Sequence, residues 1–523
     1  MSAGTDTAAH PPERDAVELQ EPANTQSSSR PAPHVHRPAR ESRRIGLNEN
    51  LVSSDISDLL CDGGSSPTKA CKAIDADVVV DRSDQTAGEA ADGSEIVAQQ
   101  HSTSSVVRLL NRIVPSGGLL SGVFNIASLT LGAGITSIPA AFNTSGMIMA
   151  IFYLLVVTVL TVFSITLLAQ AMEKTGIYSF EGLARALFGR GGDIIVAVLM
   201  WLLCFGGAVG YVIAVGDIFK PLLKGSEKPS SPNDTDGHPL VRFGVWFFFM
   251  LPLVLPKKIS SLRYVSAVGV LFIVLFVMCV VYHSIAYGLK DGIRGDLVMV
   301  RPGNAAVSGL SIFCFSYLCQ VNVGRIILEN TNSSVRKITM QATLSCAMCG
   351  TLYLLTGFFG YAEFGPSLEG NILDKYNPYQ SPVFFVVFIG LIAKLCAAFS
   401  LNMLACRTAL FQVVHWDVET MPYWKHTIVS VSFAVGAFIV GLLIPDIGIV
   451  FGFAGAFSGS FIGFVFPALF IMYCGNWNLK TVGIWYYLGT YFLLISGVVA
   501  IVFGTGSCIY SVVQEYSRAP EGK

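Results

Sequence analysis

The sequence predicts an all-α integral membrane protein with eleven transmembrane helices. Apolar residues make up 52% of the 523-residue chain and charged residues only 13%, a balance that excludes an ordinary soluble domain. From about Leu119 onward, apolar runs long enough to cross about 30 Å of hydrocarbon follow one another, separated by short polar pieces. We expect helices, because a segment exposed to lipid must satisfy its own backbone hydrogen bonds.

The chain divides into three expected parts. Residues 1–104 hold 9 Lys and Arg against 17 Asp and Glu and few long apolar stretches, so we expect a disordered, acidic, cytosolic tail. Residues 105–510 form the transmembrane domain, and residues 511–523 a short C-terminal tail. The expected spans are 119–143, 147–172, 193–220, 240–256, 262–287, 305–330, 338–364, 381–410, 425–444, 447–473 and 481–508.

Basic residues at the span ends predict the orientation. They are more numerous on the side of the N-terminal tail, and the short loop after span four holds Lys257, Lys258 and Arg263 without an acid. The tail is therefore expected in the cytosol, and an odd number of spans places the C-terminus outside. On this topology the sequon at Asn233 faces the exterior or a lumen, where it is an acceptor for glycosylation.

Several function classes are excluded by the pattern of charged residues. Basic residues sit singly between apolar runs instead of forming a patch, so we expect no nucleic-acid partner and a lipid bilayer instead. The spans contain no pair of carboxylates, metal-ligand cluster, nucleophile–base set or phosphate-binding loop. We therefore expect no enzyme, no cofactor and no metal.

The first span contains the clearest signal of a binding site. Gly132, Ala133 and Gly134 weaken the helix at mid-depth, and Pro139 removes a further backbone donor. Peptide groups freed by a break are tolerated in a bilayer only where they line a cavity or are buried in protein, so they are available to a ligand carboxylate. The alternative is that both glycines only let a neighbouring helix approach closely.

The sixth span predicts a second break. Ser316, Gln320 and Asn322 are polar residues at mid-depth, although this span lacks a central pair of glycines. Two interrupted segments five spans apart are typical of an inverted five-plus-five repeat, with the substrate site between the broken helices.

Five further residues carry polar groups in or near the spans. Tyr211, in the glycine-rich third span, either presents its hydroxyl to a site or packs. Lys394 lies near the centre of span eight, where a charge is costly, and we expect a functional or ion-substituting role rather than snorkelling. His283, near the outer end of span five, is interpreted as an interface residue. Arg325 and Glu329 are four residues apart and are expected to pair.

The chain resembles the amino acid/auxin permease family. The resemblance rests on two segments, Asn125–Pro139 with its Thr-Leu-Gly-Ala-Gly-Ile core, and Gly207–Asp217. It covers about residues 105–510, and the overall character of the sequence most resembles permeases of trypanosomatids. It implies a LeuT-type fold with broken helices 1 and 6, and secondary active transport of amino acids by alternating access, as in symporters. The expected substrate-binding residues are Thr130, Gly132, Ala133, Gly134 and Ile135 for the carboxylate, Phe315, Ser316 and Tyr317 for the amino group or side chain, and Tyr211.

Coupling is expected at Lys394, Asn125, Gln320 and Asn322. Sodium-coupled relatives hold an ion between spans one and eight, and the Lys394 ammonium is expected to take its place, which favours proton coupling or a potential-driven carrier. A sodium-coupled symporter and an amino acid sensor (transceptor) of the same fold remain alternatives. Neutral and cationic amino acids are equally expected substrates. The expected location is the plasma membrane, with a lysosomal or vacuolar membrane as the alternative.

Overall fold

The computed structural model describes residues 118–224, 239–256, 262–290, 292, 294–330, 333–368, 370–379, 382–414, 416, 422–444, 446–475 and 477–518. All of them belong to one compact unit, Ser66–Lys523. The predicted tail, the sequon at Asn233 and the lysines 257 and 258 lie outside the described residues.

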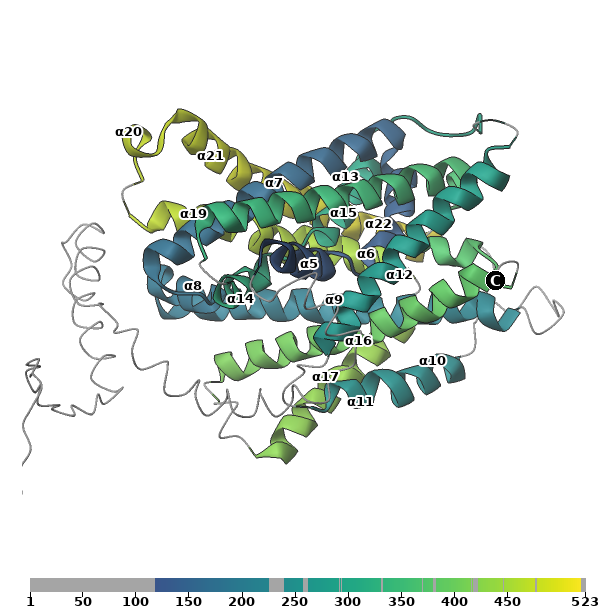
Figure 1. Cartoon of the computed structure of the whole chain (residues 1–523), viewed down its shortest axis with the longest axis horizontal. Coiled ribbons are helices and arrows are strands. Elements are labelled where there is room, and N and C mark those ends of the chain that lie inside the picture. The colour runs from purple at the N-terminus through teal and green to yellow at the C-terminus, as the bar shows by residue number, and fades with distance from the viewer. Residues whose placement is uncertain are drawn as a thin grey trace, which may run out of the picture. The chain divides into compact units, whose positions relative to one another are not determined.

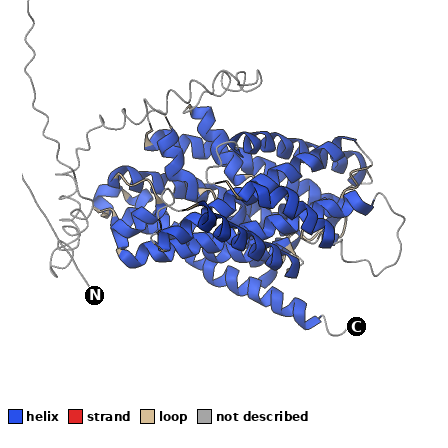
Figure 2. Cartoon of the chain, turned by 90° about the horizontal axis from the view of Figure 1, so that it is seen from below, coloured by secondary structure: helices blue, strands red, loops and turns tan. Residues whose placement is uncertain are grey.

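Every regular element among these residues is a helix (Figures 1 and 2). In chain order the helices begin with α5 (Leu119–Thr130), α6 (Gly134–Ser145), α7 (Met147–Thr175), α8 (Phe180–Phe188), α9 (Arg190–Lys224), α10 (Pro239–Val245), α11 (Leu251–Val254) and α12 (Leu262–His283). They continue with α13 (Asn304–Ser316), α14 (Val323–Glu329), α15 (Val335–Phe364), α16 (Pro382–Val413), α17 (Tyr423–Leu443), α18 (Ile447–Ala454), α19 (Phe466–Tyr473), α20 (Leu479–Val482), α21 (Ile484–Val499) and α22 (Thr505–Arg518).

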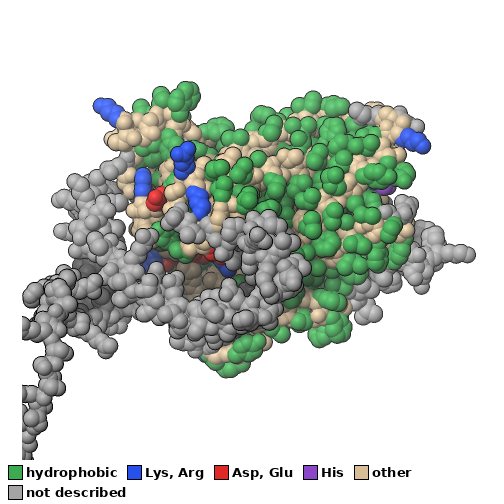
Figure 3. Space-filling view, viewed as in Figure 1, with side chains coloured by type: hydrophobic (Ala, Val, Ile, Leu, Met, Phe, Trp, Pro, Cys, Tyr) green, Lys and Arg blue, Asp and Glu red, His purple; other side chains and the backbone are tan. Residues whose placement is uncertain are grey.

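Membrane-spanning helices dominate the described part of the chain. Nine helices there are long and apolar enough to cross a membrane, and the bent pair α5 and α6 makes ten. The predicted span 240–256 corresponds to a shorter apolar helix, Arg242–Val254. Hydrophobic side chains cover the middle of the face drawn in Figure 3, and the charged side chains visible on it lie towards its ends. The prediction of an all-α, multi-pass membrane protein is confirmed.

Both predicted interruptions are present. The first separates α5 from α6, which are bent by 60° across residues 131–133. Pro139 lies inside α6, where it lacks the N–H that would bond the Ile135 carbonyl. In the sixth span α13 ends at Ser316, and a 3₁₀ turn at Gln320–Asn322 precedes α14.

The second break has a different cause from the first. The Gln320 side-chain oxygen accepts the Cys319 N–H at 3.0 Å, so a side chain takes a donor that a continuous helix would give to a backbone carbonyl. No glycine pair is needed for this break, which explains why span six lacks one.

The two ends of the described bundle are named here by the elements that lie at them. The α8 end contains the start of α5, helix α8 and the last turn of α14. The lid end contains the segments 365–368 and 370–379, which we name together the lid. Helices α9 and α16 lie side by side, α15 packs against both α5 and α6, and α13 packs against α6 (Figure 1). These contacts bring the two interruptions together in the middle of the bundle.

Candidate functional site

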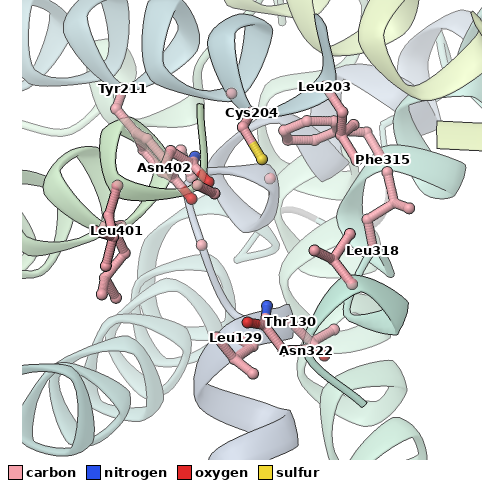
Figure 4. A pocket seen from close by; sticks show the side chains of 18 of the residues that line it. Leu129, Thr130, Leu203, Cys204, Tyr211, Phe315, Leu318, Asn322, Leu401 and Asn402 are labelled. Atoms are coloured by element: carbon pink, nitrogen blue, oxygen red, sulfur yellow. The ribbon is translucent and has the colours of Figure 1, made fainter. Parts of the chain in front are cut away.

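A cavity of about 320 Å³ lies between the two interruptions. Its wall includes the break residues Thr130–Gly134 on one side and Phe315 and Ser316 on the other, together with parts of α9 and α16. Figure 4 shows Tyr211 beside Asn402, with Phe315 across the cavity from them and Thr130 near Asn322. The cavity therefore has backbone from two interrupted helices and side chains from two continuous ones.

One hydroxyl joins the two interruptions. Tyr353, on α15, lies 2.9 Å from the Thr130 carbonyl and 2.8 Å from the Ser316 carbonyl, which belong to the last residues of α5 and α13. Tyr353 itself is fully buried. Because the last carbonyls of a helix have no partner within it, the one proton of this hydroxyl is shared between two backbone acceptors that the breaks leave without a helical partner.

The two glycines of the first break serve close approach as well as lining the cavity. A Cβ atom on Gly132 would lie 2.7 Å from the Tyr211 hydroxyl, and one on Gly134 would lie 2.6 Å from Ser316 Oγ. The two glycines therefore both line the cavity and let neighbouring helices approach closely, so both interpretations apply. The start of α6 touches the end of α13 because residue 134 has no side chain.

The remaining wall is mostly apolar. The Phe315 ring stacks on Phe451 with centroids 4.2 Å apart, which fixes its position at the cavity edge. A Cβ atom on Gly207 would lie 2.7 Å from the Asn402 amide nitrogen, so α9 and α16 come close here. Apolar or weakly polar side chains complete the wall, among them Met200, Leu203, Cys204, Leu318, Val321, Ala398 and Leu401.

Lys394 points from α16 towards the first broken helix. Its ammonium donates to the Ser128 carbonyl at 3.0 Å and to Ser128 Oγ at 3.1 Å, and only 2% of the residue is exposed. Its stem packs on α12, where a Cβ on Gly269 would collide with it. A cation is stabilised here because Ser128 lies in the last turn of α5, at the negative end of the helix dipole.

The cavity extends from the breaks towards the α8 end. Its α9 wall runs from Met200 to Tyr211, in the middle of that helix, and its α16 wall runs from Lys394 to Thr408, mostly in the half nearer that end. Glu181 of α8 and Arg325 of α14 also line it. The cavity therefore reaches residues at the α8 end of the bundle.

Glu181 is a carboxylate at this mouth of the cavity. It is 7% exposed, and burial raises its pKa above the usual range for a glutamate. It also lies in the first turn of α8, which begins at the Ser179 cap, where a negative charge is favoured by the helix dipole. Among the described residues that line the cavity, it is the one acid.

Nine of the thirteen predicted site residues line the cavity, and they are Thr130, Gly132, Ala133, Gly134, Tyr211, Phe315, Ser316, Asn322 and Lys394. The other four lie outside its wall. Ile135 is buried in the core, and the Tyr317 hydroxyl accepts a hydrogen bond from Thr158 at 2.7 Å. Asn125 donates to Glu329 at 3.1 Å, and Gln320 bonds the backbone of the second break.

Three residues of the site were not predicted. Tyr353 and Asn402 are uncharged polar residues of long membrane-spanning helices that also hold other polar side chains, so they lack the signal that marks Lys394. Glu181 gave no such signal, because it lies in a short helix between spans. Among the described residues no group of three or more His, Cys, Asp or Glu is placed to hold a metal ion.

Comparison with known proteins identifies the family. Residues 115–510 match the model of the transmembrane amino acid transporter protein family. The chain is 26% identical over 366 residues to vacuolar amino acid transporter 5 of Schizosaccharomyces pombe, covering 68% of this chain and 84% of that protein. It is 25% identical over 424 residues to amino acid transporter AVT6E of Arabidopsis thaliana, covering 76% and 84%.

A third relative is much longer than the matching region. The chain is 25% identical over 361 residues to solute carrier family 38 member 10 of Mus musculus, covering 66% of this chain but only 32% of that protein. The family match spans most of the chain and includes both interrupted helices and the cavity between them. The chain therefore belongs to the family of transmembrane amino acid transporters, which are carriers and not enzymes.

Proposed function

We propose that the protein is a secondary active transporter that moves amino acids across a membrane by alternating access. The supporting observation is the pair of interrupted helices that face one cavity and share the Tyr353 hydroxyl. A LeuT-type five-plus-five repeat, with α5–α6 as helix 1 and α13–α14 as helix 6, is part of this proposal. Family membership and the names of the relatives support amino acids as the substrate.

The dipoles of the two half-helices suit a zwitterion. Helix α6 begins at Gly134, so its first N–H groups lack partners within the helix and attract an anion. Helix α13 ends at Ser316, where the negative end of the helix dipole attracts a cation. These opposite ends meet, since Gly134 and Ser316 are in contact. We assign the substrate carboxylate to Thr130–Gly134 and its amino group to Phe315 and Ser316.

Ile135 and Tyr317 act in this proposal through the backbone and through packing. The N–H of Ile135 is at the start of α6, where it has no partner in the helix. Tyr317 follows the last residue of α13, and its ring packs edge-on against Tyr353 at 5.3 Å. Each holds a half-helix end in position, although neither side chain reaches the cavity wall.

Coupling to protons or to the membrane potential follows from Lys394. Its ammonium binds two oxygens of Ser128 between α16 and α5. A metal cation bound at this position would need the same oxygens, so the fixed charge of Lys394 takes its place. We therefore propose transport without sodium, as a proton symporter or a potential-driven carrier. Asn322 lines the cavity near this region, whereas Asn125 and Gln320 support the breaks.

Uptake into proteoliposomes tests this proposal, with a radiolabelled panel of neutral and cationic amino acids and with sodium, pH and potential varied separately. We expect uptake that is unchanged when choline replaces sodium. Lys394→Ala should lower it about tenfold, since a buried charge-assisted hydrogen bond is worth about 1.5–3 kcal/mol. Lys480→Ala, at an exposed lysine of α20, is the control. Sodium-dependent uptake that persists unchanged in Lys394→Ala would reject sodium-independent coupling.

The same experiment separates a carrier from a sensor. Saturable binding of an amino acid with no measurable flux would favour the sensor. The membrane is either the plasma membrane or a vacuolar or lysosomal one, and the name of the S. pombe relative supports the latter. Fluorescent tagging of the full chain in its own cells decides between them.

A further inference from the structure

The lid closes the end of the bundle opposite the cavity mouth. Ile372, in the lid, is fully buried, and a Cβ atom on Gly360 would lie 2.5 Å from its Cδ1 and 3.1 Å from Pro139. The lid is also held by polar contacts. Asn143 donates to the Leu368 carbonyl at 2.8 Å, and Asn371 donates to Asp217 at 3.4 Å.

A cluster of titratable side chains fastens the far end of the lid. The Glu363 carboxylate at the end of α15 lies 2.7 Å from His283 Nδ1 on α12, and it accepts the Tyr376 hydroxyl at 3.3 Å. Tyr376 belongs to the lid, and its ring also packs edge-on against the His283 ring at 5.2 Å. The cluster thus joins α12, α15 and the lid, and it is separate from the substrate cavity.

Because the cluster is largely buried, its net charge affects its stability. The side chain of Glu363 is 5% exposed and that of His283 is 24% exposed, so the carboxylate is enclosed while the ring reaches the surface of the lid end. The Glu363 side chain also packs tightly against residue 288. A Cβ atom there would lie 2.5 Å from Glu363 Cγ, so this position favours glycine. His283 is not merely a residue of the membrane interface, as its position in the sequence suggested.

Among the residues that the structure describes, the other titratable groups around the cluster leave its charge uncompensated. Tyr287 packs on His283 with ring centroids 5.0 Å apart, and Cys279 lies near Tyr376. Neither is a carboxylate or a basic side chain. Arg294 and Asp296 approach the lid at Gly365, but they pair with each other at 2.7 Å.

Two further charged residues, Asp374 and Lys375, precede Tyr376 and are exposed. They carry opposite charges and are screened by water. Neither exposed pair therefore supplies a net charge to the buried carboxylate.

The proton count of the cluster sets its charge. With a neutral imidazole, Nδ1–H donates to the carboxylate and the cluster carries one buried negative charge. A second proton on Nε2 produces an imidazolium facing the carboxylate, and the cluster becomes neutral overall. An isolated buried charge is costly, whereas a hydrogen-bonded pair of opposite charges is tolerated. Imidazole is the side chain that ordinarily titrates between about pH 5 and 8.

We propose that His283, Glu363 and Tyr376 form a proton-binding site whose occupation from the lid end holds the lid shut. This inference rests on the proposed transport function and names the site at which a proton acts on it. Proton binding at the lid end favours the state in which the lid is closed and the cavity reaches the α8 end. Acid at the lid end thus shifts the carrier towards the state in which it releases substrate at the α8 end.

Opening of the lid can be measured without transport. Ile372→Cys in the full-length protein, in proteoliposomes, is exposed to a membrane-impermeant thiol reagent only when the lid opens. Ser367→Cys, at an exposed lid position, corrects for the pH dependence of the thiol reaction, and the protein without either substitution gives the background of native cysteines. We expect the corrected labelling rate to fall at least fivefold when the pH at the lid end drops from 8 to 6, a coupling of ordinary size for linked sites.

Variants of the cluster make the test specific. His283→Gln and Glu363→Gln should each remove the pH dependence, whereas Asp296→Asn, which breaks only the exposed ion pair, should keep it. Tyr376→Phe removes one hydrogen bond and leaves the proton site, so labelling should be faster at both pH values with its pH dependence retained. A rate that does not change with pH in the intact cluster overturns the proposal, even if the other variants fail to fold.

Uptake separates the two proposals. If the intact protein moves no amino acid, the proposed transport function fails, while the labelling experiment still decides the proton site. If it transports and uptake rises with acid at the lid end, His283→Gln should abolish that rise. Transport with an unaltered acid response in His283→Gln rejects the proton site and leaves the transport function intact.

Discussion

At the scale of single residues, one tyrosine hydroxyl holds the site together. Tyr353 satisfies carbonyls at the ends of two half-helices that are far apart in the sequence. A buried carbonyl that loses its partner costs about 1–3 kcal/mol. The geometry of the substrate site therefore depends on a side chain that does not line the cavity.

Tyr353→Phe should lower the stability of the protein by about 1–3 kcal/mol and raise the KM for amino acid uptake, because both break ends lose the donor that they share. Tyr361→Phe is the matched control. This second buried tyrosine of α15 accepts the Val298 N–H at 3.0 Å, away from the cavity. Thermal unfolding in detergent should shift in both variants, but KM only in Tyr353→Phe. An equal change of KM in both would contradict a special role for Tyr353.

The residues that sequence reasoning found are those with a local signal. Gly132, Gly134 and Lys394 stand out because a glycine pair or a charge is unusual in the middle of an apolar span. Tyr353 and Asn402 reach the site only through packing of helices distant in the sequence, which a single sequence does not show. Asn125 was assigned to coupling for its depth, but it bonds Glu329.

At the scale of elements, the first break depends on the contact between α6 and α13. A Cβ atom on Gly134 would lie 2.6 Å from Ser316 Oγ and 3.3 Å from Ser316 Cα, so part of the obstacle is backbone that cannot rotate away. The start of α6 and the end of α13 would have to separate. This contact sets the spacing of the two dipoles that we propose for the substrate.

Gly134→Ala should therefore reduce uptake at least tenfold while the protein still folds, since a misplacement of about 1 Å at a binding constellation is costly. Gly191→Ala on α9 is the control, because a Cβ atom there meets nothing within 4 Å. Combining Gly134→Ala with Ser316→Ala removes the nearest obstacle and should restore part of the uptake. Wild-type uptake in Gly134→Ala would show that the contact is not needed.

The fold was predictable where each element carries its own pattern. Apolar runs located the spans, and glycine and proline located the first break. The predicted span 240–256 is a shorter apolar helix, Arg242–Val254, in which a π-helical turn, Trp246–Met250, joins α10 to α11. The lid and its fastening were not predictable, because Glu363, Tyr376 and His283 meet only in the folded chain.

At the scale of the whole molecule, the cavity is reached from one end and the lid covers the other. Thr408 is exposed and lines the cavity towards the α8 end. Thr408→Cys should therefore react with an impermeant reagent added at that end, and a transported amino acid should slow the reaction at least threefold by occupying or closing the cavity. Thr481→Cys, exposed on α20, should react at a rate independent of amino acid.

This labelling also tests the orientation of the chain. With the N-terminal tail in the cytosol, Thr408→Cys should be labelled in permeabilised cells and protected in intact ones. Labelling in intact cells under the same conditions would place the α8 end outside and reverse the proposed direction of transport.

The decisive question is whether peptide groups at the two interruptions bind both charged ends of an amino acid. Competition for uptake into proteoliposomes answers it, using one transported amino acid, its methyl ester and its N-acetyl derivative. The amino acid should compete fully, and each derivative should compete at least a hundredfold more weakly, because a charge facing a half-helix end is lost in each. Equal competition by the ester and the parent amino acid would show that the start of α6 does not hold the carboxylate.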